Sequence, residues 1–81
     1  MRTPFASGEP EDVVISTDVI RLGQLLKFAD VAESGAEAGA LIAGGDVLVD
    51  GEVETRRGRQ LGRGAVVEVR TPVGVRRLRV S

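Results

Sequence analysis

The chain has 81 residues, a formal net charge of −1, 42% hydrophobic residues and 2% aromatic residues, which is enough for one small globular domain. It contains neither cysteine nor histidine, and this excludes disulfides, thiolate metal sites and the commonest general base of enzymes. It also lacks an apolar run of about 18 residues and the apolar centre of a signal peptide, so we expect a cytoplasmic protein that does not enter a membrane.

The small net charge hides an uneven distribution along the chain. Residues 1–55 carry three basic and eleven acidic side chains, whereas residues 56–81 carry eight arginines and a single acid, Glu68. Ten of the eleven basic residues are arginine, whose planar guanidinium suits phosphate, although a GC-rich genome explains that preference equally well. The clustering predicts a basic surface opposite an acidic one.

The chain begins with a stretch of low apolar content. Residues 1–11 contain two prolines and one glycine, so we expect a disordered leader there and a single domain over residues 12–81. The β-branched run 13–15 predicts a short strand at a sheet edge. Residues 16–18, Ser-Thr-Asp, predict a turn that also caps the following helix.

A first helix is indicated by apolar residues with the spacing i, i+3, i+4 and i+7, namely Leu22, Leu25, Leu26 and Ala29. The polar residues interspersed among them are predicted to face solvent: Arg21, Gln24 and Lys27. The helix spans about two turns, so packing rather than intrinsic propensity has to stabilise it.

A capping box opens a second helix. The hydroxyl of Ser34 is expected to accept from the amide of Glu37, whose carboxylate reaches back to Ser34. The residues predicted to face inward are Ala38, Leu41 and Ile42. Gly39 weakens a helix by about 1 kcal/mol relative to alanine, which indicates close packing against this position within the domain. Gly44 or Gly45 is predicted to supply the left-handed stop.

A hairpin follows, with Val47–Val49 as its first strand and Asp50-Gly51 as its turn. A two-residue turn would pair Leu48 with Val53. The alternation of Val47, Val49 and Val53 favours instead a longer, bulged loop that puts these three side chains inward, and this is the alternative we expect.

The last part of the chain has the pattern of a second hairpin. Gly62–Gly64 predicts a turn, residues 65–69 a strand, residues 72–74 a turn, and residues 75–80 a strand whose imperfect alternation allows a bulge. The predicted fold is therefore α+β, with two short helices packed on one face of a small, mostly antiparallel sheet that has added terminal strands.

The placed elements resemble the RNA-binding domain named after ribosomal small-subunit protein four, called here the S-four domain or alpha-L RNA-binding motif. The resemblance spans residues 20–70 and is carried by Arg21-Leu22-x-x-Leu25-Leu26-Lys27, Ser34-x-x-x-Ala38, Ile42-x-x-Gly45-x-Val47-x-Val49-Asp50-Gly51 and Gly64-x-x-Val67-x-Val69. Two further segments resemble the small stand-alone bacterial proteins of the YbcJ type, namely Glu33-Ser34-Gly35-Ala36-x-Ala38 and Val49-Asp50-Gly51-x-Val53-Glu54-Thr55-Arg56.

The resemblance implies a protein that binds structured RNA, either ribosomal or transfer RNA, in association with the ribosome. It implies contacts on the exposed side of the first helix and in the basic loop after the hairpin. The implied site residues are Arg21, Gln24, Lys27, Ser34, Arg56, Arg57, Arg59 and Arg63. Gly35 and Gly39 stand where many members carry basic residues, so the loop arginines have to supply more of the affinity.

Elementary chemistry agrees with such a role. Neutralising phosphates with arginine or lysine supplies most of the sequence-independent affinity for nucleic acid, and duplex RNA is read mainly by shape. The chain has no tryptophan or tyrosine, and we expect Phe28 in the core, so recognition by base stacking is disfavoured. For Arg76, Arg77 and Arg79 we expect alternating charges that protect an edge strand rather than RNA contacts.

Two other function classes compete with RNA binding. The alternative is a protein-interaction module that docks a basic partner on an acidic helical face formed by Asp30, Glu33 and Glu37. An enzyme is not expected, because no paired carboxylates and no phosphate-cradling glycine loop stand in a suitable context. No cofactor and no metal are expected either.

Overall fold

The computed structural model describes residues 10–81, which fold into one sheet of five strands, one sheet of two strands and two helices. The strands are β1 (Glu11–Val13), β2 (Val19–Arg21), β3 (Val47–Val49), β4 (Glu52–Val53), β5 (Gln60–Gly62), β6 (Val66–Thr71) and β7 (Gly74–Val80). The helices are α1 (Leu22–Phe28) and α2 (Gly35–Ala43). Neither helix is long and apolar enough to cross a membrane, a finding that covers the described residues.

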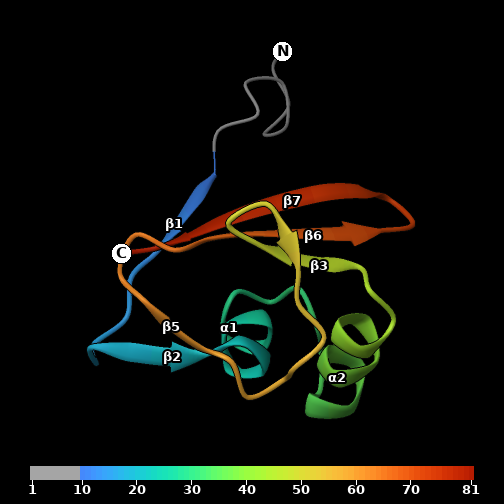
Figure 1. Ribbon diagram of the computed structural model, residues 1–81, viewed down its shortest axis with the longest axis horizontal. Helices are drawn as coiled ribbons and strands as arrows, with labels where there is room; N and C mark the ends of the chain where they lie inside the picture. The colour runs from blue at the N-terminus through green and yellow to red at the C-terminus, as the bar shows by residue number, and fades with distance from the viewer. Residues whose placement is uncertain (1–9) are drawn as a thin grey trace.

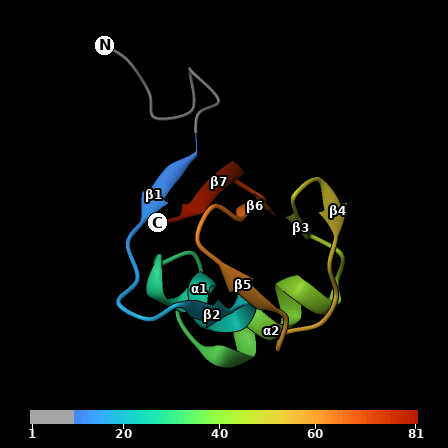
Figure 2. The same cartoon turned by 60° about the vertical axis from the view of Figure 1, so that its left-hand side comes forward.

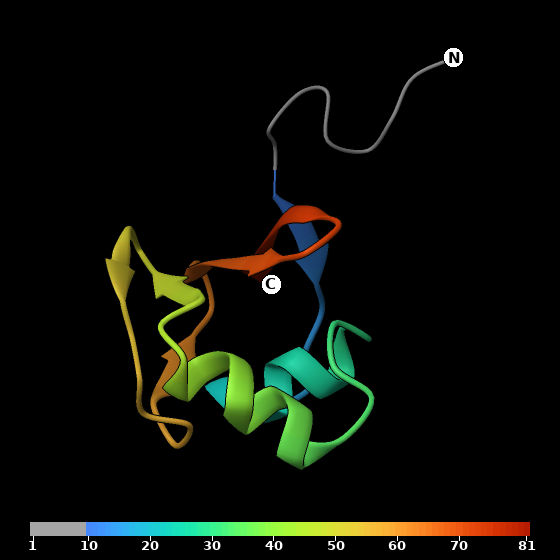
Figure 3. The same cartoon turned by 90° about the vertical axis from the view of Figure 1, so that its right-hand side faces the viewer.

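The molecule has two layers. The larger sheet has the order β1-β7-β6-β3-β4 and forms the upper layer in Figure 1, while α1, α2 and the β2–β5 pair form the lower layer. Figure 3 shows the two helices side by side beneath the sheet. Only the pairing of β1 with β7 is parallel, so the predicted α+β fold, with two helices on one face of a mostly antiparallel sheet, is confirmed.

The core fills the space between these layers. The predicted stripe of α1 is buried at Leu22, Leu25 and Leu26, and α2 contributes Ala38 and Ile42. The sheet contributes the side chains of every second residue, namely Val47, Val49, Val67, Val69, Leu78 and Val80. Ala29 and Leu41, also predicted inward, are half-buried and pack against the rim of this core.

The N-terminal part departs from the prediction. Most of the predicted leader, residues 1–9, lies outside the described residues, but β1 already begins at Glu11, two residues before the predicted strand. It is an edge strand, as predicted, and Figure 2 shows it at the opposite end of the sheet from β4. Because β1 pairs with β7 at Leu78–Val80, Arg79 is not on an edge strand as predicted, whereas Arg76 and Arg77 lie on the part of β7 that the described residues of β1 do not cover.

The β3–β4 hairpin has a two-residue turn, so the expected bulged loop is wrong. Leu48 pairs with Val53, whose side chain is 56% exposed instead of inward. Asp50 and Gly51 have φ values of 50° and 90°, as the mirror-image turn of a tight hairpin requires. Asp50 is held there because its Oδ1 accepts from the amide of Val66 at 3.0 Å.

The strand β7 runs without the bulge that its sequence allowed. Its antiparallel register with β6 is continuous from the pair Val66–Arg79 to the pair Thr71–Gly74. Regular alternation therefore turns Val75 outward and Arg76 toward the helical layer. The guanidinium of Arg76 donates to both carboxylate oxygens of Glu11, at 2.9 and 3.1 Å, which links β7 to β1.

Candidate nucleic-acid interface

The loop of residues 54–59, between β4 and β5, is fastened to the N-terminus of α1. The amide of Leu22 donates to the carbonyl of Arg59 at 2.8 Å, and the amide of Gly23 donates to the carbonyl of Arg57 at 3.0 Å. These amides are among those that a helix leaves without an internal partner. Loop carbonyls cap the helix, and β2 precedes it, so the cap predicted from residues 16–18 is wrong.

Glu54 divides the arginines of this loop into two groups. It is the one charged side chain that is buried among residues 10–81, with 7% of its surface exposed. Its carboxylate accepts from Arg56 Nε at 3.0 Å, from Arg56 Nη2 at 3.1 Å and from Arg59 Nη1 at 2.7 Å. The hydrogen bonds from Arg56, followed by that from Arg59, lower the pKa of Glu54 from 4.5 to about 2. Two of the three loop arginines thus share one carboxylate, which offsets one of their two positive charges.

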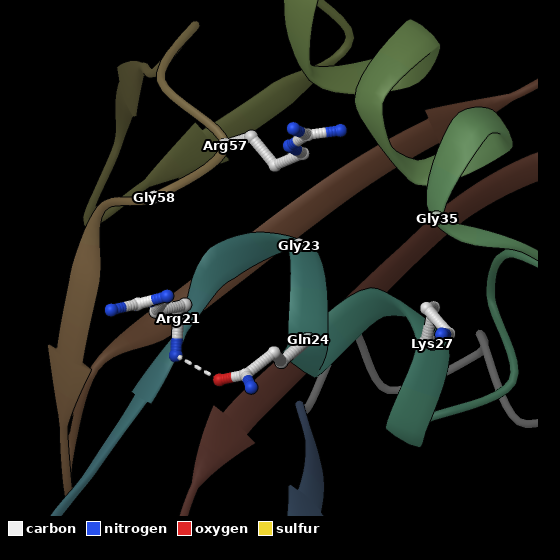
Figure 4. A pocket seen from close by; sticks show the side chains of 7 residues that line it. All are labelled: Arg21, Gly23, Gln24, Lys27, Gly35, Arg57 and Gly58. Carbon is white, nitrogen blue, oxygen red and sulfur yellow. Dashed lines mark hydrogen bonds between the residues drawn. The ribbon is translucent and has the colours of Figure 1, made fainter.

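Arg57 points the other way, toward the two helices (Figure 4). Its Cγ lies only 2.7 Å from the position that a Cβ on Gly23 would occupy, and its Nη1 lies 3.5 Å from the corresponding position on Gly39. Gly23 is therefore needed to leave room for this side chain. The neighbour of Gly39 is also Arg57, from within the domain as predicted, but a Cβ at residue 39 would make only an ordinary contact, so the predicted close packing is not seen there.

Arg57 lines an open groove of about 390 Å³, shown in Figure 4. The complete lining is Arg21, Gly23, Gln24, Lys27, Gly35, Arg57 and Gly58. Within the described chain, Arg21, Lys27 and Arg57 form no ion pair with a carboxylate. We call the hollow between these three side chains the cationic groove. Three uncompensated charges around one concave surface raise the local concentration of anions.

Gln24 stands at the rim of the cationic groove. Its Oε1 accepts from the backbone amide of Arg21 at 3.1 Å, the bond drawn as a dashed line in Figure 4. This bond fixes the side-chain amide against the first turn of α1. The structure thus brings together four of the predicted site residues, namely Arg21, Gln24, Lys27 and Arg57.

Ser34 has a structural role at the start of α2. It is the N-cap residue, and its Oγ accepts from the amide of Glu37 at 3.1 Å, as the capping box predicted. The carboxylate of Glu37, however, accepts from the amide of Glu33 at 2.8 Å and not from Ser34. Of the exposed acids Glu33 and Glu37, only the carboxylate of Glu37 is therefore engaged in starting the helix.

Arg63 lies at the far end of β5 from the cationic groove. The β2–β5 register pairs Arg21 with Gln60 at one end and Val19 with Gly62 at the other. The guanidinium of Arg63 donates to Asp18 at 3.4 Å, which ties the turn after β5 to the segment before β2. Arg63 therefore does not join the groove residues.

Phe28 was predicted in the core, and this is wrong, because 64% of its surface is exposed. With Gln24 and Lys27 it lines a second hollow, of about 330 Å³. The helical spacing indicated that Phe28 is exposed, since it is four residues from the exposed Gln24 and lies off the buried stripe of α1. Sequence reasoning missed this residue by treating an aromatic side chain as an apolar one to be buried.

Comparison with known proteins agrees with this arrangement. Residues 13–75 match the family model of the S4 domain, which is the S-four domain of the sequence analysis. A relative from Bacillus subtilis (strain 168), described as "Probable ribosome maturation protein RlbA", is 47% identical over 57 residues, which cover 70% of this chain and 80% of the relative. The family match starts in β1, ends in β7 and includes both helices, the hairpin and the arginine loop. The chain therefore belongs to the S4 domain family.

Proposed function

We propose that this protein binds structured RNA of ribosomal or transfer origin by holding its phosphate backbone in the cationic groove. The observation that carries the proposal is the convergence of Arg21, Lys27 and Arg57 on one open groove without carboxylate partners in the described chain. Membership of the S4 domain family and the ribosome maturation named for the relative support an RNA or ribosomal partner. The proposed role is binding and not catalysis.

The cations of the groove are held on rigid parts of the fold. Arg21 is the N-cap residue of α1, Lys27 lies in its last turn, and the backbone of Arg57 is hydrogen-bonded to Gly23. Because the backbone at these positions is already ordered, only side-chain conformational entropy is lost when phosphates bind between the cations. Arrays of this kind recognise the spacing of phosphates, which is how proteins read the shape of folded RNA.

We propose a different role for Arg56 and Arg59. Their bonds to Glu54 shape the loop and thereby set the direction in which Arg57 leaves it. Arg56 remains largely exposed, so it still adds to the positive potential beside the groove, although Glu54 offsets part of that charge. Arg57 is therefore expected to contribute more affinity than either neighbour.

The test compares two triple variants that remove the same charge. One is Arg21→Ala, Lys27→Ala, Arg57→Ala in the groove. The other is Arg70→Ala, Arg77→Ala, Arg79→Ala on the opposite face of the sheet, which β6 and β7 turn away from the helices. Both are titrated with a structured ribosomal RNA fragment over a range of salt concentrations. Circular dichroism establishes that both variants are folded.

The groove variant is expected to bind more weakly, and its plot of log affinity against log salt should be shallower by about two to three, whereas the sheet variant should resemble wild type. Equal losses of RNA affinity in both variants would contradict binding in the groove and would show that binding depends on net charge. A loss of affinity confined to the sheet variant would show that the RNA binds on β6 and β7. If wild type fails to bind even at low salt, the proposal fails, and the exposed acids Asp30, Glu33 and Glu37 become the surface to test for a protein partner.

A further inference from the structure

Phe28 is the only aromatic residue in the described part of the chain, and it lies in water beside the cationic groove. Because the ring is exposed, the domain lacks the stabilisation that burying it would give. The other large exposed apolar side chains of residues 10–81 lie on other elements or turns, namely Val14, Val19, Val53, Val73 and Val75. The ring is therefore the one large apolar side chain that α1 exposes.

The hollow at Phe28 adjoins the cationic groove. Gln24 and Lys27 line both hollows, so the cationic groove and the hollow at the ring share the amide and the ammonium group. Gln24 and Phe28 are four residues apart and therefore lie on the same side of α1, with Cβ atoms about 6 Å apart. A nucleotide bound at the groove therefore has the ring within its reach.

We propose that Phe28 stacks against an unpaired base of the RNA whose backbone lies in the cationic groove, so that the preferred ligand is a bulged or looped RNA and not a continuous duplex. This inference rests on the function proposed above. A paired base inside a duplex shows only its edges, whereas an unpaired base can turn its face onto an aromatic side chain. The ring therefore adds a preference that phosphate contacts alone do not supply.

Gln24 is placed to support such a base. Its Oε1 is occupied by the amide of Arg21, which leaves the N–H groups of Nε2 to donate. Because Gln24 lines both hollows, these donors are available to the edge of a base stacked on the ring. Every nucleobase presents acceptors at its edge, so Gln24 would favour a base over another flat apolar group.

The test uses two RNA hairpins that differ in a single nucleotide and whose strands are joined by a hexaethylene glycol linker instead of a loop of bases, so that the bulge is the one unpaired position. One hairpin is fully paired, and the other carries one bulged adenine, which is replaced by 2-aminopurine for fluorescence. Wild type is compared with Phe28→Leu, which keeps an apolar side chain without a ring face, and with Phe28→Trp, which keeps the face. Because the side chain is exposed, all three proteins should unfold at the same temperature.

Wild type and Phe28→Trp are expected to prefer the bulged hairpin and to quench 2-aminopurine. Phe28→Leu should bind the bulged hairpin about 5- to 150-fold more weakly, which corresponds to the loss of one base–aromatic stack. Its affinity for the paired hairpin and the salt dependence of that affinity should stay unchanged, because the cations are intact.

Two results would overturn the inference while leaving RNA binding in place. If Phe28→Leu binds both hairpins like wild type, the ring does not touch RNA and is left for a protein contact. If Phe28→Leu weakens both hairpins equally, the ring supports the groove and does not stack. If wild type binds neither hairpin, both the inference and the proposed function fail, which separates this outcome from the first two.

Discussion

The side chain of Arg57 reaches the cationic groove past two glycines, of which only Gly23 is needed to leave room for it. On α1, Gly23 lies under the aliphatic part of the side chain, and on α2, Gly39 lies under the guanidinium. The two positions are not equivalent. A Cβ at residue 23 would come within 2.7 Å of the Arg57 Cγ, which no real contact tolerates, whereas a Cβ at residue 39 would make an ordinary contact at 3.5 Å.

This difference predicts opposite outcomes for two identical substitutions. Gly23→Ala should push Arg57 out of the groove and make the salt dependence of RNA affinity shallower by about one, as Arg57→Ala does. Gly39→Ala should leave binding unchanged and raise the free energy of unfolding by about 1 kcal/mol, since alanine is the better helix former. RNA titrations and urea unfolding measure both. In an Arg57→Ala background, Gly23→Ala should have no further effect on binding.

Glu54 makes the loop sensitive to acid. Its pKa is lowered in the folded protein from 4.5 to about 2 by the bonds from Arg56 and Arg59. A lowered pKa means that the carboxylate stabilises the fold above pH 4.5 and that this contribution is lost as the pH falls toward 2. Glu54→Gln should be less stable than wild type at neutral pH and should lose less stability over that acidic interval.

Urea unfolding at a series of pH values measures this effect. Glu52→Gln is the matched control, because it removes the same charge from the neighbouring strand β4 at a residue without an ion pair in the described chain. Indistinguishable pH profiles for the two variants would refute the role assigned to Glu54.

The helices and the place of the hairpin turn could be predicted from sequence, but the length of its loop was predicted wrongly and the small β2–β5 sheet was not predicted. The apolar stripe of α1 and the cap at Ser34 follow from spacing within a few residues. The alternation around Val53 favoured a bulge, yet the turn preference of Asp50-Gly51 prevailed. One reason lies outside the hairpin, because Asp50 also binds the amide of Val66 on β6, a contact between residues 16 positions apart.

The turn predicts a test at Asp50. Asp50→Ala removes the acceptor for Val66 and places a side chain with no polar compensation at positive φ, so the free energy of unfolding should fall by about 1–2 kcal/mol. Asp50→Asn keeps an oxygen at the same place and tolerates the same φ, so it should retain most of the stability. Thermal unfolding of the two variants measures the difference. Equal stability of the alanine and asparagine variants would show that the hydrogen bond to Val66 contributes nothing.

The charge asymmetry of the sequence did not translate into a simple basic surface. Acids of the N-terminal half pair with arginines of the C-terminal half, in the ion pairs Glu11–Arg76, Asp12–Arg79 and Asp18–Arg63. Partners so far apart in the chain cannot be identified from composition, because pairing depends on which strands become neighbours. The candidate site consists of cations that are left without an ion pair. Arg21 and Lys27, at the two ends of α1, come from the acidic half of the chain, and Arg57 comes from the loop.

The parallel pairing of β1 with β7 makes the N-terminal strand part of the fold and supplies the last prediction. Val13 is 9% exposed and faces Val80 of β7, while the adjacent Val14 is 71% exposed. Val13→Ala should lower the free energy of unfolding by about 2 kcal/mol, through lost burial and the cavity left behind. Val14→Ala deletes the same atoms from a solvent-exposed side chain and should change the free energy of unfolding by less than about 0.5 kcal/mol. Urea unfolding decides between them. Equal effects would mean that ion pairs and backbone hydrogen bonds, which both variants keep, hold β1 to the sheet without help from the burial of Val13.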